Sequence, residues 1–256
     1  MIKKWEVTVP EQTGDALRYA YIYLPEGYEE SDRRYPVLYM FDGHNVFFDS
    51  DATYGKSWGM GEYLDRTGTQ LIVAAVECDH GEKPGRLSEY SPFDFCLPKI
   101  CSAKGRGKIT MDWFVNTFKP YVDANYRTLS DREHTLIAGS SMGGLMSLYA
   151  VTEYNSVFSR AACLSPSVWA NNSKLMALLK TAEIAPGTVV YLDYGEVELK
   201  QNHGGIMRRL LEKTVKCLLE RDVLLEFRIV PDGEHCEASW EKQIPFFMNT
   251  LFYGLE

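Results

Sequence analysis

A short glycine-rich stretch in the middle of the chain constrains the fold more than any other feature. It reads Gly139-Ser140-Ser141-Met142-Gly143-Gly144, the pattern G-x-S-x-G with an additional glycine. An apolar run typical of a buried strand precedes it at 134–138, and a segment with helical spacing follows at 145–151. A strand, a sharp turn centred on Ser141 and a helix are the arrangement that presents a nucleophilic serine at the edge of a sheet.

The glycines and the following helix both suit a reactive Ser141. Side chains at Gly139 and Gly143 would collide where the strand and the helix approach each other. The free N–H groups of the helix N-terminus would point toward the Ser141 oxygen, where negative charge develops during nucleophilic attack. The alternative interpretation is a glycine-rich packing turn that carries no chemistry.

Predicted strands and predicted helices alternate along the chain. The strands are expected at 5–10, 17–24, 37–41, 71–78, 134–138, 160–164, 188–194 and 223–230, and the helices at 56–66, 110–125, 145–154, 172–182, 203–221 and 237–252. This order predicts an α/β fold with a mostly parallel central sheet and helices on both faces, in a single domain over residues 1–256. The segment 79–109 lacks periodicity and is expected to be a variable, cap-like loop region.

Charge and composition exclude several functional classes. The net charge of −8 and the absence of a Lys/Arg block argue against binding to nucleic acid or to an anionic membrane. No apolar run approaches the ~20 residues that span a bilayer, and no apolar segment follows the N-terminal lysines as in a secretory signal. The six cysteines have irregular spacing, so we expect reduced thiols in a cytoplasmic protein.

A serine nucleophile needs a general base, and His235 is the predicted one. It follows the last predicted strand on the loop Pro231-Asp232-Gly233-Glu234-His235, at the sheet edge where Ser141 is expected. The other four histidines are less suitable: they are His44 and His80 on loops, His134 at the opposite end of the Ser141 strand, and His203 at the start of a helix. A solvated loop histidine is the alternative for His235.

The acid that orients the base should follow the strand 188–194. Candidates are Glu198, Glu196 and Asp193, and we favour Glu198 because it lies on the loop three residues beyond Gly195. Each of them has the alternative interpretation of a solvated carboxylate. All three remain open at this point.

Two backbone N–H groups should bind the oxyanion. One is that of Met142, the residue after the nucleophile. The other should come from the loop Asp42-Gly43-His44-Asn45, with His44 as first choice and Asn45 next.

With these residues placed, the chain resembles the putative esterase family of α/β-hydrolases, which includes enterochelin esterases, S-formylglutathione hydrolase and feruloyl esterases. The resemblance spans nearly the whole chain. It rests on the segments 35–43, 89–92, 126–128, 139–144 and 164–167, on Gly195-x-x-Glu198 and on Gly233-Glu234-His235.

The resemblance implies Ser141 as nucleophile, His235 as base and Glu198 as acid, and it supports Met142 and His44 as oxyanion donors. Residues 79–107 would form the variable cap. Expected pocket residues are Asn45, Trp58, Tyr90 and Trp169, with packing as the alternative for the three aromatic side chains. Arg86 is expected to meet an anionic substrate or, preferably, to pair with Glu89.

The predicted function is hydrolysis of a small or medium carboxylic ester through an acyl-enzyme. The alternatives are acyl transfer to an alcohol or sugar, and a non-catalytic binding protein on the same fold. No metal or other cofactor is predicted, because no His and Cys ligand cluster is visible in the sequence. The expected partner is a small-molecule ester.

Overall fold

The structure is a computed structural model that describes residues 1–81, 84–97, 101–200 and 204–255. Its strands are β1 (Ile2–Val7), β2 (Arg18–Tyr23), β3 (Val37–Met40), β4 (Ile72–Val76), β5 (Phe95–Leu97), β6 (Cys101–Ala103), β7 (Thr135–Ser140), β8 (Arg160–Leu164), β9 (Thr188–Gly195) and β10 (Val223–Val230). The prediction made for His203 lies outside the described residues.

The helices are α1 (Pro10–Thr13), α2 (Met60–Thr67), α3 (Gly85–Glu89), α4 (Gly107–Trp113), α5 (Lys119–Asn125), α6 (Met142–Glu153), α7 (Asn172–Thr181), α8 (Glu196–Lys200), α9 (Gly204–Leu219), α10 (Glu237–Glu241) and α11 (Ile244–Phe252). Two 3₁₀ turns, η1 (Tyr28–Glu30) and η2 (Gly43–Asn45), and a π-helical turn, η3 (Phe114–Phe118), complete the elements. Within the described ranges, no helix is long and apolar enough to cross a membrane.

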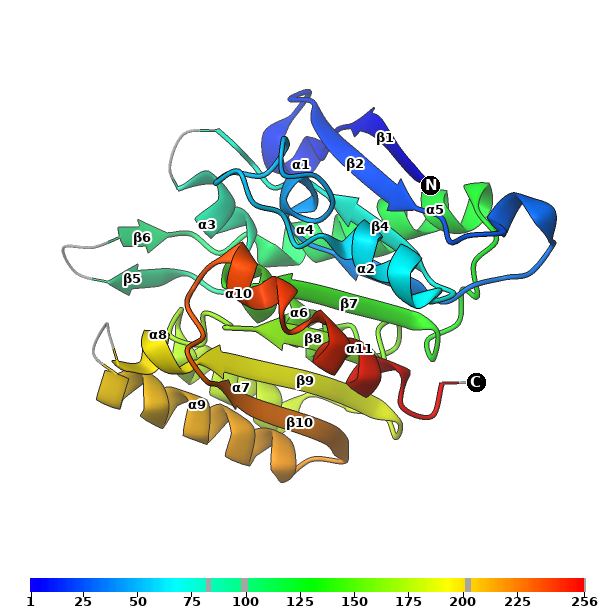
Figure 1. The fold of residues 1–256 in the computed structure, drawn as a ribbon. Helices are drawn as coiled ribbons and strands as arrows, with labels where there is room; N and C mark the ends of the chain where they lie inside the picture. The colour runs from blue at the N-terminus through cyan, green and yellow to red at the C-terminus, as the bar shows by residue number, and fades with distance from the viewer. Residues whose placement is uncertain (82–83, 98–100, 201–203, 256) are drawn as a thin grey trace.

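Eight of the described strands form one sheet in the order β1-β2-β4-β3-β7-β8-β9-β10, and β5 and β6 form a separate two-stranded sheet (Figure 1). The pairs β1–β2 and β2–β4 are antiparallel, and the other neighbours are parallel. Strand β3 has β4 as its neighbour on one side and β7 on the other. The sheet therefore has its switch point between β3 and β7, where ligands bind in open α/β sheets.

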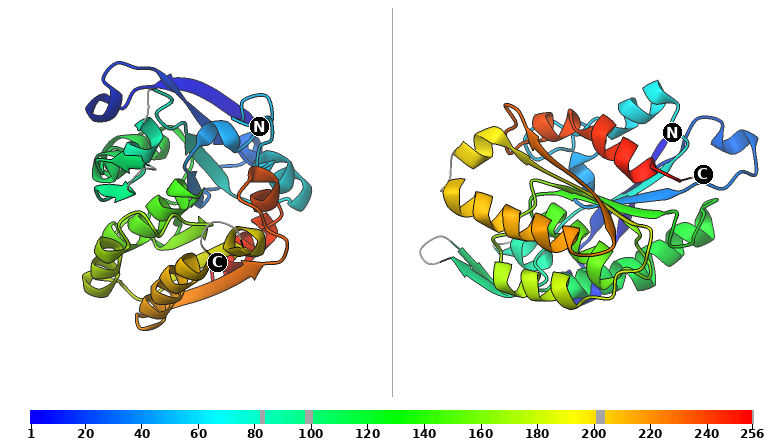
Figure 2. Two further views of the ribbon diagram at one scale, coloured as in Figure 1. Left: turned by 90° about the vertical axis from the view of Figure 1, so that its left-hand side faces the viewer. Right: turned by 90° about the horizontal axis from the view of Figure 1, so that it is seen from below.

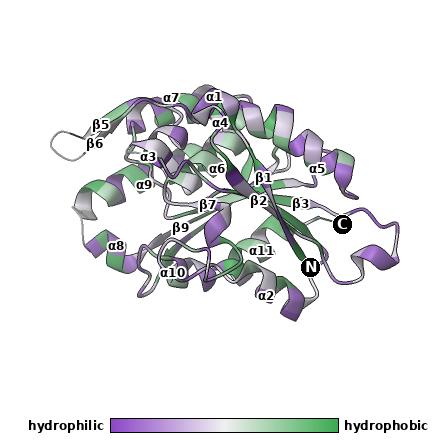
Figure 3. Cartoon of the chain, turned by 90° about the horizontal axis from the view of Figure 1, so that it is seen from above, coloured by the Kyte–Doolittle hydropathy of each residue, from purple (hydrophilic) through white to green (hydrophobic). Residues whose placement is uncertain are grey.

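Helices cover both faces of the sheet, as predicted. Figure 2 shows α2 and α11 on one face, and α5 to α7 with α9 on the other. Successive residues of the central strands point to opposite faces, so Tyr39 joins one buried cluster while Leu38 and Met40 join the second. Hydrophobic residues gather in these inner strands (Figure 3). The fold class is therefore the α/β arrangement predicted from the sequence.

Three predicted elements differ in detail. The helix expected at 110–125 runs without a break through α4, η3 and α5, and Pro120 follows directly after the π-helical turn η3. The helix expected at 237–252 is divided into α10 and α11. The loop region 79–109 contains helix α3 and the hairpin β5–β6.

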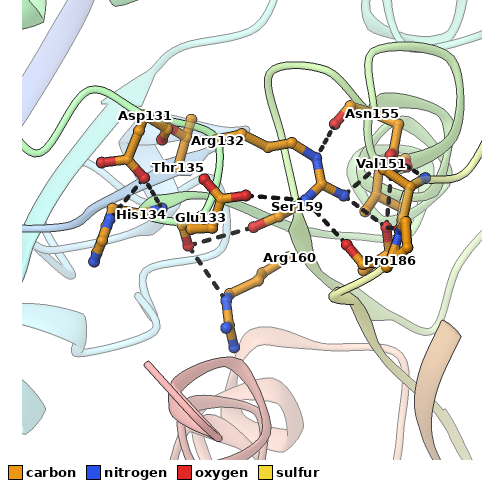
Figure 4. Close-up of polar contacts among 12 residues, drawn as sticks. Asp131, Arg132, Glu133, His134, Thr135, Val151, Asn155, Ser159, Arg160 and Pro186 are labelled. Atoms are coloured by element: carbon orange, nitrogen blue, oxygen red, sulfur yellow. Dashed lines mark hydrogen bonds and ion pairs between the residues drawn. The ribbon is translucent and has the colours of Figure 1, made fainter. Parts of the chain in front are cut away.

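Buried polar groups hold the amino ends of β7 to β9 together (Figure 4). The Arg132 guanidinium donates to Asn155 Oδ1 at 3.0 Å and to Thr188 Oγ1 at 2.8 Å. The Asn155 amide group in turn donates to Thr188 Oγ1 at 3.0 Å and to the Val151 carbonyl oxygen at 2.7 Å. His134 lies at this end of the sheet, 2.7 Å from Asp131, and therefore far along the strand from Ser141, as predicted.

Candidate active site

Ser141 lies at the tight turn between β7 and α6, with φ 57° and ψ −118°. This conformation is rare for a residue with a side chain, and it directs the Ser141 hydroxyl away from the strand. A Cβ atom on Gly139 would lie 2.7 Å from the Gly143 carbonyl carbon, which no side chain tolerates. The predicted requirement for glycine beside the serine is therefore confirmed at Gly139.

A short hydrogen bond joins Glu198 and His235 at the same edge of the sheet. Glu198 Oε2 lies 2.6 Å from His235 Nδ1. Glu198 Oε1 accepts hydrogen bonds from Ser165 Oγ at 2.6 Å and from the Gly195 N–H at 3.2 Å. The carboxylate side chain is 7% exposed and the imidazole 45%, so the acid is fixed inside the protein while the base faces the solvent-filled cavity.

Glu198 lies on the short helix α8 rather than on the expected loop, and the residue before α8, Gly195, touches the loop of His235 through glycine backbone. A Cβ atom on Gly233 would lie 2.9 Å from the Gly195 Cα atom. The adjacent strands β9 and β10 lead into these segments in parallel, so the close approach brings position 198 beside position 235. Glycine at both positions therefore sets the spacing of the carboxylate and the imidazole.

The other two carboxylates considered from the sequence make different contacts. Asp193 accepts hydrogen bonds from the Ser165 N–H and from the Tyr191 hydroxyl, at 3.0 Å each. Burial raises the pKa of Asp193 to about 7, against these two hydrogen bonds, which lower it. Glu196 pairs with Lys200 at 2.8 Å on the surface, and this hydrogen bond lowers the pKa of Glu196.

The Ser141 hydroxyl lies 3.5 Å from Ser167 Oγ. In the described part of the chain no hydrogen bond joins Ser141 to His235, although both line the same two cavities. Catalytic hydrogen bonds are often long in unliganded enzymes and shorten when substrate binds. The geometry thus brings serine, histidine and glutamate to one rim of the sheet, as the sequence predicted.

The backbone N–H groups of Met142 and His44 have no hydrogen-bond acceptor among the described residues. The Asn45 N–H donates to the Asp42 carbonyl oxygen at 2.8 Å. Because β3 and β7 are neighbours, η2 and the start of α6 lie at one edge of the sheet. Of the two donors considered in this loop, His44 is the one whose N–H is free to bind an oxyanion.

The loop that carries His44 is held by a partly buried ion pair. Arg86 donates to both carboxylate oxygens of Asp42, at 2.7 and 2.6 Å. The pairing of Arg86 with Glu89 that we expected is wrong, because Glu89 instead pairs with Arg18 at 2.7 Å. Asp42 itself has φ 56°, and the Arg86 guanidinium holds the pKa of Asp42 below its usual value despite burial.

Two of the expected pocket residues pack in the core. Tyr90 is fully buried, and its hydroxyl accepts a hydrogen bond from the Asp42 N–H at 3.2 Å. Trp58 packs against Trp240, with ring centroids 6.1 Å apart, and Trp240 in turn packs edge-on against the His235 ring at 5.0 Å. Both side chains are therefore part of the packed interior next to the site, and neither lines a cavity beside Ser141.

Two cavities meet at Ser141 and His235. The first, of about 550 Å³, we call the Glu198 cavity; Trp169 lines it, as expected. The second, of about 380 Å³, we call the His44 cavity; Asn45 lines it, as expected.

Sequence reasoning missed two groups of residues. Ser165, at the end of β8, connects Glu198 to Trp240, whose indole N–H donates to Ser165 Oγ at 3.2 Å. Its place in the Leu-Ser-Pro-Ser segment after a predicted strand was the available signal. The second group is His44, Cys78 and His80, which come together in the His44 cavity although their spacing in the sequence shows no ligand motif.

Comparison with known proteins identifies the family. The family described as "Putative esterase" matches residues 15–245. The chain belongs to this family. It is therefore an enzyme of the ester-hydrolase class, and the prediction of the family is confirmed.

Three relatives illustrate the similarity. An uncharacterized protein, YbbA of Bacillus subtilis, is 24% identical over 75% of this chain and 73% of its own length. The siderophore triacetylfusarinine C esterase of Aspergillus fumigatus is 27% identical over 54% of this chain and 46% of its own length. The structure of the siderophore hydrolase EstA from Aspergillus nidulans superposes with a TM-score of 0.73 and 19% identity, covering 98% of this chain and 95% of that one.

Proposed function

We propose that this family member is a serine carboxylic-ester hydrolase that works through an acyl-enzyme. The observation that carries the proposal is the 2.6 Å contact between Glu198 and His235, made beside Ser141 in a shared cavity. A serine needs a base and the base needs an orienting acid, and the three groups occur here in the chain order Ser, Glu, His.

In the proposed reaction, the Ser141 oxygen attacks the ester carbonyl carbon while His235 Nε2 takes the hydroxyl proton. Glu198 accepts the hydrogen bond from His235 Nδ1, which fixes the tautomer and stabilises the imidazolium. His235 then gives the proton to the departing alcohol. Water attacks the acyl-enzyme by the same steps in reverse, and the carboxylic acid leaves.

The N–H groups of Met142 and His44 would donate to the oxygen that becomes negatively charged in each tetrahedral intermediate. The N-terminus of α6 adds its positive end at the same point. Loss of one such donor typically costs about 10²- to 10³-fold in turnover. Because the His44 donor is a main-chain group, its position depends on the loop held by Asp42 and Arg86 rather than on the His44 ring.

The two cavities suggest where the halves of the ester lie. An ester whose carbonyl carbon is at Ser141 has one half directed into the Glu198 cavity, past Trp169, and the other into the His44 cavity, past Asn45. Volumes of about 550 and 380 Å³ suit a small or medium ester. Two relatives carry names that specify siderophores, so siderophore esters belong in the first substrate panel with acetyl, butyryl and feruloyl esters.

Water is the proposed acyl acceptor. The His235 imidazole is 45% exposed, so water reaches the base directly. Product analysis with added alcohol or sugar distinguishes hydrolysis from acyl transfer. We also propose a cytoplasmic location, because all six cysteines are unpaired, as thiols are in a reducing compartment.

The test of the proposal is Ser141→Ala with a p-nitrophenyl acyl ester. We expect turnover to fall by at least about 10³-fold, because the nucleophile is removed while the oxyanion donors remain. Ser173→Ala, an exposed serine on α7, is the matched control and should keep full activity. Retained turnover in Ser141→Ala would refute the proposal.

A further inference from the structure

A second group of reactive side chains lies in the His44 cavity and has no role in the proposed hydrolysis. One donor atom from each of His44, Cys78 and His80 lies within 4.8 Å of the others. His44 is on η2 after β3, and the other two residues follow β4. Because β3 and β4 are parallel neighbours, their carboxyl ends place these loops together.

The donor set fits a borderline-soft divalent cation. Two imidazole nitrogens and one thiolate sulfur are ligands of Zn²⁺, which takes four of them in a tetrahedron with donor atoms about 3.5 Å apart. All three donor atoms lie within 4.8 Å of one another, so each separation exceeds this value by about 1.3 Å at most. His80 is exposed, so its side chain is free to move toward the other two ligands.

The His44 ring shows an independent sign of a missing partner. The residue is 5% exposed, and its Nδ1 atom is buried without a hydrogen-bond partner among the described residues. Its Nε2 atom lies 3.0 Å from Thr53 Oγ1. Metal-ligating histidines commonly have this arrangement, in which one ring nitrogen is held by a neighbouring group and the other binds the ion. Buried polar atoms without a partner are rare in proteins.

We propose that His44, Cys78 and His80 bind one Zn²⁺ ion in the wall of the His44 cavity, with a fourth position open to the cavity. On binding, the Cys78 thiol releases its proton to solvent and its sulfur lone pair bonds to the ion. Asp42 keeps its two hydrogen bonds from Arg86.

Bound zinc also limits access to Ser141. Ser141 lines the same cavity as the three ligands, so the ion and its fourth ligand occupy space that one half of the ester would need. This consequence rests on the proposed function, and it predicts that zinc inhibits turnover. The binding itself is measured without any ester, so failure of one proposal is distinguishable from failure of the other.

The experiment is a titration of the chelator-treated protein with Zn²⁺ by calorimetry, and with Co²⁺ by absorption spectroscopy. We expect one ion per chain and a thiolate-to-cobalt absorption band. His80→Ala, which changes an exposed side chain, should weaken Zn²⁺ binding by at least about 10-fold. Cys78→Ala should abolish the cobalt band while His80→Ala retains a weaker one.

The matched controls are Cys96→Ser and His134→Ala, which remove a thiol and an imidazole elsewhere on the surface and should bind Zn²⁺ as the natural chain does. Circular dichroism of Cys78→Ala confirms that the variant is folded. Absence of stoichiometric binding, or binding that is unchanged in both His80→Ala and Cys78→Ala, would overturn the proposal. Zinc inhibition that persists unchanged in His80→Ala would overturn the predicted effect on turnover.

Discussion

Polar groups are hydrogen-bonded at the amino end of β7, whereas at its carboxyl end some of them have no partner. At the amino end, the Asn155 side chain is buried, and both its oxygen and its amide nitrogen make two hydrogen bonds to neighbouring segments. At the carboxyl end, Ser141 has a strained backbone, and the N–H groups of Met142 and His44 have no acceptor in the described chain.

The amino end of β7 therefore contributes mainly to the stability of the fold, and the carboxyl end mainly to the proposed reaction. Satisfied buried groups lower the free energy of the folded state, whereas strained or unpaired groups raise it and persist where a substrate can use them. The strain at Ser141 and the free donors beside it are stabilised by the rest of the sheet, including the Arg132 network at the far end. Substitutions at the two ends should therefore change different measurements.

The largest expected effect is at the carboxyl end, in Glu198→Gln. Glutamine keeps an oxygen for the bonds from Ser165 and Gly195, but it presents an N–H to His235 Nδ1 and favours the wrong tautomer. We expect kcat for a p-nitrophenyl ester to fall by about 10²- to 10⁴-fold, with little change in the urea unfolding midpoint. Glu196→Gln is the control and should keep full activity. Equal activity of the two variants would remove Glu198 from the triad.

The second effect is at the amino end, in Asn155→Ala. Arg132, Thr188 and the Ala185 N–H would each lose a buried partner, so we expect the free energy of unfolding to fall by about 3 kcal/mol. Activity per folded molecule should be unchanged. Asn125→Ala, an exposed asparagine, should change stability by less than about 0.5 kcal/mol. A large loss of kcat in folded Asn155→Ala would contradict the separation of the two ends.

A smaller effect tests the buried carboxyl beside the acid. The pKa of Asp193 is raised from its usual 3.8 to about 7 by burial, so the folded state holds this proton more tightly than the unfolded state. The free energy of unfolding of the natural chain should therefore fall as pH rises from about 4 to about 7, and it should be constant above that. In Asp193→Asn this dependence is absent.

The measurement is urea unfolding of both proteins between pH 5 and pH 7.5. The stability of Asp193→Asn relative to the natural chain should rise by roughly 2 kcal/mol over this interval, since one pKa unit corresponds to about 1.4 kcal/mol. Asp32→Asn controls for loss of one exposed negative charge. A constant difference across the interval would show that Asp193 is ionised throughout in the folded protein.

The sequence was sufficient to predict features that depend on short stretches of chain and on the order of strands. Glycine spacing around Ser141, together with strand and helix periodicity, located the turn, because sterics at Gly139 allow few other structures. Chain order and the carboxyl-edge rule then placed His235 and Glu198 beside each other at one edge of the sheet, although Glu198 lies on helix α8 and not on the expected loop.

The remaining features depend on contacts between segments far apart in the chain. Arg86 has Glu89 three residues away, yet it pairs with Asp42, because the fold brings η2 beside α3. The direction of Trp58 depends on the packing of α10, which periodicity does not specify. Likewise, the approach of His80 to His44 arises from two loops without a regular pattern.

The most direct test of the account is labelling with a fluorophosphonate, followed by intact mass measurement and peptide mapping. The account predicts one adduct per chain on the Ser141 hydroxyl, formed far more slowly in His235→Ala. Labelling at Ser167, whose hydroxyl lies 3.5 Å away, or turnover of an ester by a chain that resists labelling, would contradict it.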